Sequence, residues 1–152
     1  MRASEFMSHP PITIDENATA EQAAQLMIAK KIDCLPVIDA SGALRGIVTP
    51  SDYTTKEVGI PFSIIRAPQV LGRWLPPGGI EAIYRSARET PVHAIMTRTP
   101  VTCGQTDSLD KVASLLVDRK VHHVIVVHDH RPVGVVARHD LLRAMTRATA
   151  TT

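Results

Sequence analysis

An internal repeat constrains the fold of this 152-residue chain more than any other feature of its sequence. A shift of 89 residues lays Phe6-Met7-Ser8-His9 on Ile95-Met96-Thr97-Arg98, and a shift of 88 residues lays 46–52 on 134–140. The two copies span roughly residues 7–53 and 96–145. Because each copy must form the same structural unit, the repeat decides the architecture before local propensities are considered.

Each copy predicts the same order of elements, β-α-β-β-α. An extended segment after a proline (12–14 and 101–103) precedes a helix whose apolar residues recur at i, i+3, i+4 and i+7. Thr19 and Gln22 have the spacing of a capping box at the start of the first helix, and Ser108 can cap the second. Strands rich in β-branched residues follow at 35–38 and 44–48, and at 124–127 and 133–137 around a turn at 128–132.

The predicted fold class is mixed α+β, with the two repeats packed as a pseudo-two-fold pair, because one copy is too small to bury its own sheet. The expected domains are repeat 1 at 1–53, an inserted linker with a short helix at 54–91, and repeat 2 at 92–152. The linker exceeds the roughly 2 to 8 residues of ordinary connections. It either covers exposed edges of the pair or of a dimer, or serves as a docking or gating element.

Composition and charge exclude several classes of protein. The formal net charge is +2 and the basic residues are scattered singly, which predicts no nucleic-acid partner. No stretch approaches the roughly 18 uncharged apolar residues of a membrane span. Cys34 and Cys103 lack metal-ligand spacing and fit a reducing cytoplasm. The histidines crowded into 122–139 have no nearby Cys or Glu to complete a set of ligands, so no metal site is predicted.

Three features in order resemble a pair of cystathionine-beta-synthase (CBS) domains, a Bateman module. They are the start Phe6-Met7 or Ile95-Met96 followed by a proline, the strand 34–38, and the turn Gly-hydrophobic-hydrophobic-Thr/Ser-x-x-Asp, complete at 46–52. The resemblance implies a regulatory fold that binds an adenosine-containing nucleotide in clefts between the repeats. The ligand stays open among AMP, ADP, ATP, S-adenosylmethionine and a dinucleotide. No cofactor is required for catalysis, because the resemblance is to a sensor and not to an enzyme.

The turn that closes each repeat is the candidate ligand site. Thr49 at the N-cap and Asp52 three residues later have capping-box spacing, so they could serve only to start a helix. The same groups suit a nucleotide, because a helix N-terminus attracts phosphate and a carboxylate can accept two hydrogen bonds from ribose. On this interpretation, replacing Asp52 with alanine costs ligand binding with little loss of fold.

The second copy departs from the pattern, since Ala137 replaces the hydroxyl residue while Asp140 remains. Arg138 and His139 beside this turn could supply positive charge for a phosphate, or form an exposed basic helix start. One occupied site and two occupied sites both stay open. The resemblance implies that the residues at the start of one strand in each repeat line an adenine pocket. The alternative is that they only form part of the core of the sheet. These residues are Cys34, Leu35, Pro36, His123 and Val124.

The function predicted from the sequence is a small cytoplasmic regulatory module, not an enzyme, that senses an adenosyl ligand. The resemblance also implies a homodimer and a regulated protein partner. The competing hypothesis is an interaction scaffold that binds no nucleotide and docks through residues 54–91.

Overall fold

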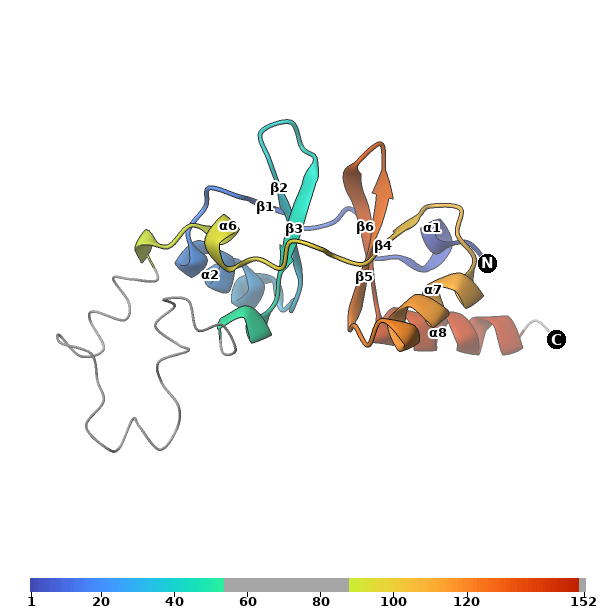
Figure 1. The fold of residues 1–152 in the computed structure, drawn as a ribbon. Helices are drawn as coiled ribbons and strands as arrows, with labels where there is room; N and C mark the ends of the chain where they lie inside the picture. The colour runs from blue at the N-terminus through green and yellow to red at the C-terminus, as the bar shows by residue number, and fades with distance from the viewer. Residues whose placement is uncertain (54–87, 151–152) are drawn as a thin grey trace, which may run out of the picture. The chain divides into compact units, whose positions relative to one another are not determined.

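The computed structural model describes residues 1–53 and 88–150, which form two compact units (Figure 1). Unit 1 contains residues 1–12, 40–44 and 99–150, and unit 2 contains residues 13–39, 45–53 and 88–98. The turns and the helix predicted between residues 54 and 87 lie outside the described residues.

Both units have mixed helix and strand content, and the predicted order of elements is confirmed, except that the described part of the final helix of the first repeat is a 3-10 helix, Pro50–Tyr53. Unit 2 has a three-stranded sheet in the order β1-β2-β3, with β1 parallel to β2, and unit 1 has a sheet in the order β4-β5-β6, with β5 parallel to β4 and antiparallel to β6. The elements of unit 2 are β1 (Ile14–Asp15), α2 (Ala20–Lys30), β2 (Leu35–Ile38), β3 (Leu44–Val48), the 3-10 helix η1 (Pro50–Tyr53) and α6 (Val92–Ile95). Those of unit 1 are α1 (Ala3–Phe6), β4 (Thr102–Gly104), α7 (Leu109–Asp118), β5 (His123–His128), β6 (Arg131–Ala137) and α8 (Arg138–Thr149).

The predicted capping groups start α2 and α7. At α2, Gln22 N donates to Thr19 Oγ1 at 3.1 Å, and Thr19 N donates back to Gln22 Oε1 at 3.0 Å. At α7, Lys111 N donates to Ser108 Oγ at 3.2 Å. These bonds satisfy amide groups that have no partner inside the helix, which is why the helix starts could be placed from sequence.

The second hairpin has a shorter turn than the predicted 128–132. Strand β5 runs to His128 and β6 begins at Arg131, so only Asp129 and His130 form the turn. Both have left-handed backbones, with φ of 48° and 64°, as a two-residue hairpin turn requires. The prediction was wrong because Pro132 was taken as a turn residue, whereas it lies in β6 beside an irregularity in the strand register.

Two short segments, one from each repeat, complete the opposite unit. The N-terminal strap (residues 1–8) packs in unit 1, and the central strap (residues 90–97) packs in unit 2. Figure 1 shows α1, in blue, among the orange and red elements of the second repeat. The compact units therefore do not coincide with the repeats of the sequence. Each strap precedes one repeat along the chain but packs in the unit that contains the helices of the other repeat.

Equivalent backbone hydrogen bonds hold the two straps. In unit 1 they are Ala3 N to Asp107 O (2.8 Å), Ser4 N to Gln105 O (3.0 Å) and Leu109 N to Met1 O (3.1 Å). In unit 2 they are Val92 N to Ala18 O (2.7 Å), His93 N to Glu16 O (3.0 Å) and Ala20 N to Thr90 O (2.8 Å). Each strap also pairs with an edge strand, Ser8 with Val135 of β6 and Thr97 with Ile47 of β3.

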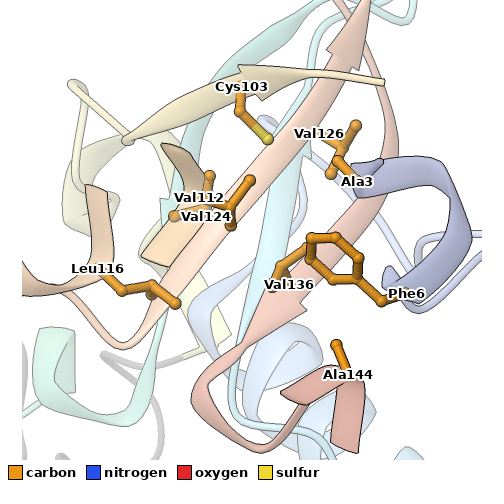
Figure 2. Packing of buried hydrophobic residues seen from close by; sticks show 9 residues of the cluster. All are labelled: Ala3, Phe6, Cys103, Val112, Leu116, Val124, Val126, Val136 and Ala144. Carbon is orange, nitrogen blue, oxygen red and sulfur yellow. The ribbon is translucent and has the colours of Figure 1, made fainter. Parts of the chain in front are cut away.

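The core of unit 1 depends on its strap. Figure 2 shows Phe6 of α1 beside Val136 of β6, and Ala3 of α1 beside Val126 of β5. The cluster is aliphatic except for Phe6 and Cys103, and the strap supplies its only ring. Its buried members are Ala3, Phe6, Cys103, Val112, Leu116, Val124, Val126, Val136 and Ala144.

Replacing Gly46 with alanine should destabilise the chain by about 1–3 kcal/mol, the usual range for overpacking. A Cβ at this position would lie 2.5 Å from the Thr97 carbonyl oxygen, which is backbone and cannot move without disturbing the strap pairing. Gly134→Ala is the matched control, because the three atoms closest to its Cβ all belong to the Met7 side chain, which can rotate, and none is backbone. Urea unfolding measures both changes, and an equal or larger loss for Gly134→Ala would contradict this account of the straps.

Candidate functional site

In unit 2, Asp52 anchors the turn that follows β3. Its Oδ2 accepts a hydrogen bond from Thr49 N at 2.8 Å, and its Oδ1 accepts one from Thr97 Oγ1 of the central strap at 3.1 Å. Only 3% of Asp52 is exposed. The predicted reach of Asp52 back to the cap is therefore present. Thr49 does not complete the capping box with its side chain, since its hydroxyl lies 2.8 Å from that of Ser51.

The expectation that Asp52 can be lost with little cost to the fold stays a prediction, and the two hydrogen bonds of its buried carboxylate argue against it. Its carboxylate joins the turn to the strap, and its removal leaves the amide of the half-buried Thr49 and the hydroxyl of Thr97 without these bonds. Beside it, Tyr53 donates a hydrogen bond to Ala20 O at 2.6 Å, which ties the same turn to the start of α2. Burial, and then the charge of Asp52, raise the pKa of the Tyr53 hydroxyl.

In unit 1 the equivalent turn is anchored in the same way. Asp140 Oδ2 accepts a hydrogen bond from Ala137 N at 2.9 Å, and its Oδ1 accepts an ionic hydrogen bond from Arg143. Arg143 thus donates to Oδ1 of the aspartate in unit 1, as Thr97 does in unit 2. Asp140 is 5% exposed, whereas Arg138 and His139 at the start of α8 are exposed. The side chains at this start therefore combine a buried carboxylate with two accessible basic groups.

The strand residues predicted to line a ligand pocket divide into two groups. Leu35, Pro36 and Val124 are fully buried, so their side chains contribute to the cores of their units. Cys34 and His123 occupy the same position in the two repeats, next to β2 and at the start of β5. His123 pairs with Ala137 across the hairpin, which places it beside the Asp140 turn. A ligand-binding role for these five residues stays a prediction.

Both cysteines are buried, and neither forms a disulfide. Burial first, and then the charges of Asp33 and Asp52, raise the pKa of the Cys34 thiol from 9.0 to about 12. Burial and the charge of Asp107 raise the pKa of the Cys103 thiol to about 11. Both thiols therefore stay protonated at neutral pH.

Two hollows adjoin the turns. The first, which we call the α1–α8 pocket, has a volume of about 350 Å³ and lies within unit 1 between the N-terminal segment and α8; its lining residues are Glu5, Phe6, Met7, Ser8, His9, Asp140, Arg143, Ala144 and Arg147. The second lies within unit 2 along α2 and η1, has a volume of about 440 Å³ and is largely apolar, with Ile28 and Tyr53 in its lining.

Asp140 was predicted from the sequence as a site residue, whereas Glu5, Arg143 and Arg147 of the α1–α8 pocket were not. Asp140, Arg143, Ala144 and Arg147 recur at i, i+3, i+4 and i+7, which places them on one face of α8 and could have revealed them. Glu5 could not be connected with them, because no local pattern shows that the N-terminal strap packs in the unit of the second repeat. Thr97 was missed as a partner of Asp52 for the same reason.

Within residues 1–53 and 88–150, no group of three or more His, Cys, Asp and Glu side chains is placed to hold a metal ion. No helix of this described part is long and apolar enough to cross a membrane.

A small sheet covered by helices and closed by an anchored turn, formed twice in one chain, defines a protein of paired β-α-β-β-α units. The model of the CBS domain family matches residues 3–57 and 92–147. The chain therefore belongs to the CBS domain family, as its sequence motifs indicated.

Solved structures of CBS domains resemble the chain over nearly its whole length. The CBS domain of a CBS domain containing membrane protein from Sphaerobacter thermophilus is 34% identical, with a TM-score of 0.76, over 94% of this chain and 86% of that one. The CBS domain pair of protein MJ0100, solved with 5′-methylthioadenosine and S-adenosyl-L-methionine, is 26% identical, with a TM-score of 0.70, over 97% and 98% of the two chains.

Curated relatives include larger proteins with enzyme names. Homoserine O-acetyltransferase from Methanohalophilus mahii is 41% identical over 145 residues, which make up 95% of this chain and 24% of that protein. L-aspartate semialdehyde sulfurtransferase from Methanocaldococcus jannaschii is 27% identical over 91% of this chain and 22% of its own length. The chain thus spans about a quarter or less of these two relatives.

Neither thiol should react quickly with a thiol reagent such as DTNB at pH 8 while the chain is folded. The raised pKa values keep both cysteines protonated, and burial blocks the reagent. Unfolding in guanidinium chloride should release both thiols at once, which provides the control. Rapid modification of either cysteine in the folded chain would contradict the burial described here.

Proposed function

We propose that the chain is a regulatory module that binds an adenosine-containing ligand at its anchored turns and performs no catalysis of its own. Asp52 and Asp140 would bind the ribose hydroxyls. Thr49 in unit 2, and Arg138 and His139 in unit 1, would bind the group attached to the ribose. A protein partner would then respond to the liganded form, as a coupling between ligand and partner requires.

The observation that supports this proposal is the formation of the same anchored turn at equivalent positions of both repeats. Asp52 and Asp140 each accept a hydrogen bond from the backbone amide three residues earlier, at 2.8 and 2.9 Å. A carboxylate offers about four lone-pair sites, so anchoring the turn does not exhaust its capacity to accept hydrogen bonds. Capping and ligand binding are therefore compatible roles for one side chain.

The comparison with protein MJ0100 adds a ligand class. That CBS pair, 26% identical to this chain, holds 5′-methylthioadenosine and S-adenosyl-L-methionine. Both compounds carry an adenosine group, for which the two turns of this chain offer carboxylates. We therefore add 5′-methylthioadenosine to AMP, ADP, ATP and S-adenosylmethionine as candidate ligands.

A thermal-melt panel of these five compounds tests the proposal. A ligand at 100 times its Kd adds about 2.7 kcal/mol, and each kcal/mol raises Tm by roughly 2–4 °C for a chain of this size. Asp52→Asn should weaken binding in unit 2 by about 1–3 kcal/mol, because an amide replaces one acceptor of the ribose with a donor.

Ser108→Ala provides the matched control, since it removes a helix cap of unit 1 and lowers Tm without touching the Asp52 turn of unit 2. Its ligand-induced shift should equal that of the parent chain. A flat panel would refute the proposed function. An unchanged affinity in unit 2 of Asp52→Asn would refute the assignment of the site.

We also propose a cytoplasmic homodimer. The two buried, unpaired cysteines fit a reducing compartment. Ile28 of α2 and Val117 of α7 occupy equivalent positions in the two repeats, and they are 77% and 70% exposed. Large apolar side chains exposed at matching places support burial against a second copy of the chain.

Val117→Glu should shift the dimer toward monomer, because a carboxylate in the interface loses its hydration without gaining a partner. Thr106→Glu adds the same charge at an exposed position outside α7 and should leave the dimer intact. Size-exclusion chromatography with light scattering measures both masses. A parent chain that is monomeric at all concentrations would exclude the homodimer.

A further inference from the structure

The two anchored turns keep their aspartate but differ in charge at the positions around it. Three pairs of equivalent residues change in the same direction, from acidic or neutral in repeat 1 to basic in repeat 2. All six side chains are exposed, so a ligand at either turn meets this difference. The pairs, given by the shifts of 88 and 89 residues, are Asp33 and His122, Pro50 and Arg138, and Ser51 and His139.

The strands of unit 1 bring its basic residues to one end of the sheet. His123 at the start of β5 pairs with Ala137 at the end of β6. His122 precedes the first of these residues and Arg138 follows the second, so both lie at this end of the hairpin. The basic side chains therefore surround a single turn and are not spread over the unit.

Two basic side chains of unit 1 are available to a ligand. The carboxylate of Asp140 is neutralised within the unit, because Arg143 donates an ionic hydrogen bond to it. Arg138 and His139 lie beside this pair at the start of α8. Among residues 1–53 and 88–150, neither of these two side chains has a hydrogen-bond or ion-pair partner. The guanidinium and the imidazole can therefore donate to an acceptor from outside the chain.

The turn of unit 2 has the opposite character. Its sequence, Thr-Pro-Ser-Asp-Tyr, contains no basic residue. The carboxylate of Asp52 accepts hydrogen bonds from two neutral donors, the amide of Thr49 and the hydroxyl of Thr97. Besides burial, the charges of Asp33 and Asp52 raise the pKa of the Cys34 thiol to about 12. Two carboxylates thus act on the beginning of β2, at a position where unit 1 has an imidazole.

We infer that the two turns bind adenosine compounds of different charge, an inference that rests on the proposed function. The turn of unit 1 binds a phosphorylated compound such as AMP, with two phosphate oxygens on the planar guanidinium of Arg138. The turn of unit 2 binds a compound without phosphate, such as 5′-methylthioadenosine. A phosphate there would meet carboxylates and no basic residue of the turn, and repulsion of this kind is a common source of specificity.

Selection by charge gives the chain two ligands at once. Because each compound has its own turn in its own unit, neither displaces the other. A protein partner that responds to both turns would then respond to the proportion of phosphorylated and unphosphorylated adenosine compounds.

Calorimetric titration of the full chain with AMP and with 5′-methylthioadenosine tests the inference. The parent should bind one molecule of each, and saturation with 5′-methylthioadenosine should change the Kd of AMP by less than twofold. Arg138→Gln should weaken AMP by roughly 10- to 100-fold, as expected for loss of a charged hydrogen bond, and leave 5′-methylthioadenosine unchanged.

Arg131→Gln is the matched control. It removes the same charge from an exposed position at the opposite end of β6 and should bind both compounds as the parent does. Melting curves without ligand verify the fold of both variants.

Three results would overturn the inference and leave the proposed function standing. They are competition of AMP and 5′-methylthioadenosine for one site, binding of AMP to two equal sites, and an Arg138→Gln variant that binds both compounds more weakly by the same factor or neither more weakly. If no adenosine compound binds the parent, the proposed function fails and the inference fails with it.

Discussion

The pairing of each strap with an edge strand is the interaction on which the rest of the structure depends. Ser8 exchanges two backbone hydrogen bonds with Val135, and Thr97 exchanges two with Ile47. The pairing covers strand edges that would otherwise present unpaired amide and carbonyl groups. It also brings Phe6 into the core of unit 1 and Thr97 to the carboxylate of Asp52. Core, turn and pocket are therefore all built on contacts between residues far apart in the sequence.

Features with a local cause could be predicted from the sequence. The strands at 35–38 and 44–48 and the cap at Thr19 follow from residue types within a few positions of one another. The strap contacts could not be predicted, because Ala3 and Asp107 have no pattern that connects them before the fold is known. The contacts of the candidate site also include local ones, which could be predicted, and long-range ones, which could not. The reach of Asp52 to Thr49 is local and was predicted, whereas its bond with Thr97 and the position of Glu5 beside α8 are not local.

Burial gives the two aspartates a structural role that cannot be separated from their proposed role in binding. Asp52 is 3% exposed and Asp140 is 5% exposed, and both hold the backbone of the turn that contains them. A ligand that reaches such a carboxylate meets a group already fixed in position, so little conformational freedom remains to be lost on binding. The two turns differ in what surrounds the carboxylate, with a neutral hydroxyl from Thr97 in one and a guanidinium from Arg143 in the other.

The exchange of straps also bears on how such a chain could arise by gene duplication. A single ancestral copy, with its own strap bonded elsewhere, would leave its edge strand uncovered until a second molecule supplied the missing segment. Two such molecules that traded their leading segments would already have formed the paired arrangement before their genes were joined. Fusion would then have converted an exchange between molecules into one within a molecule, and freed each half to diverge. Glu5 in the lining of the α1–α8 pocket of one unit and Ala94 at the equivalent position of the other illustrate this divergence.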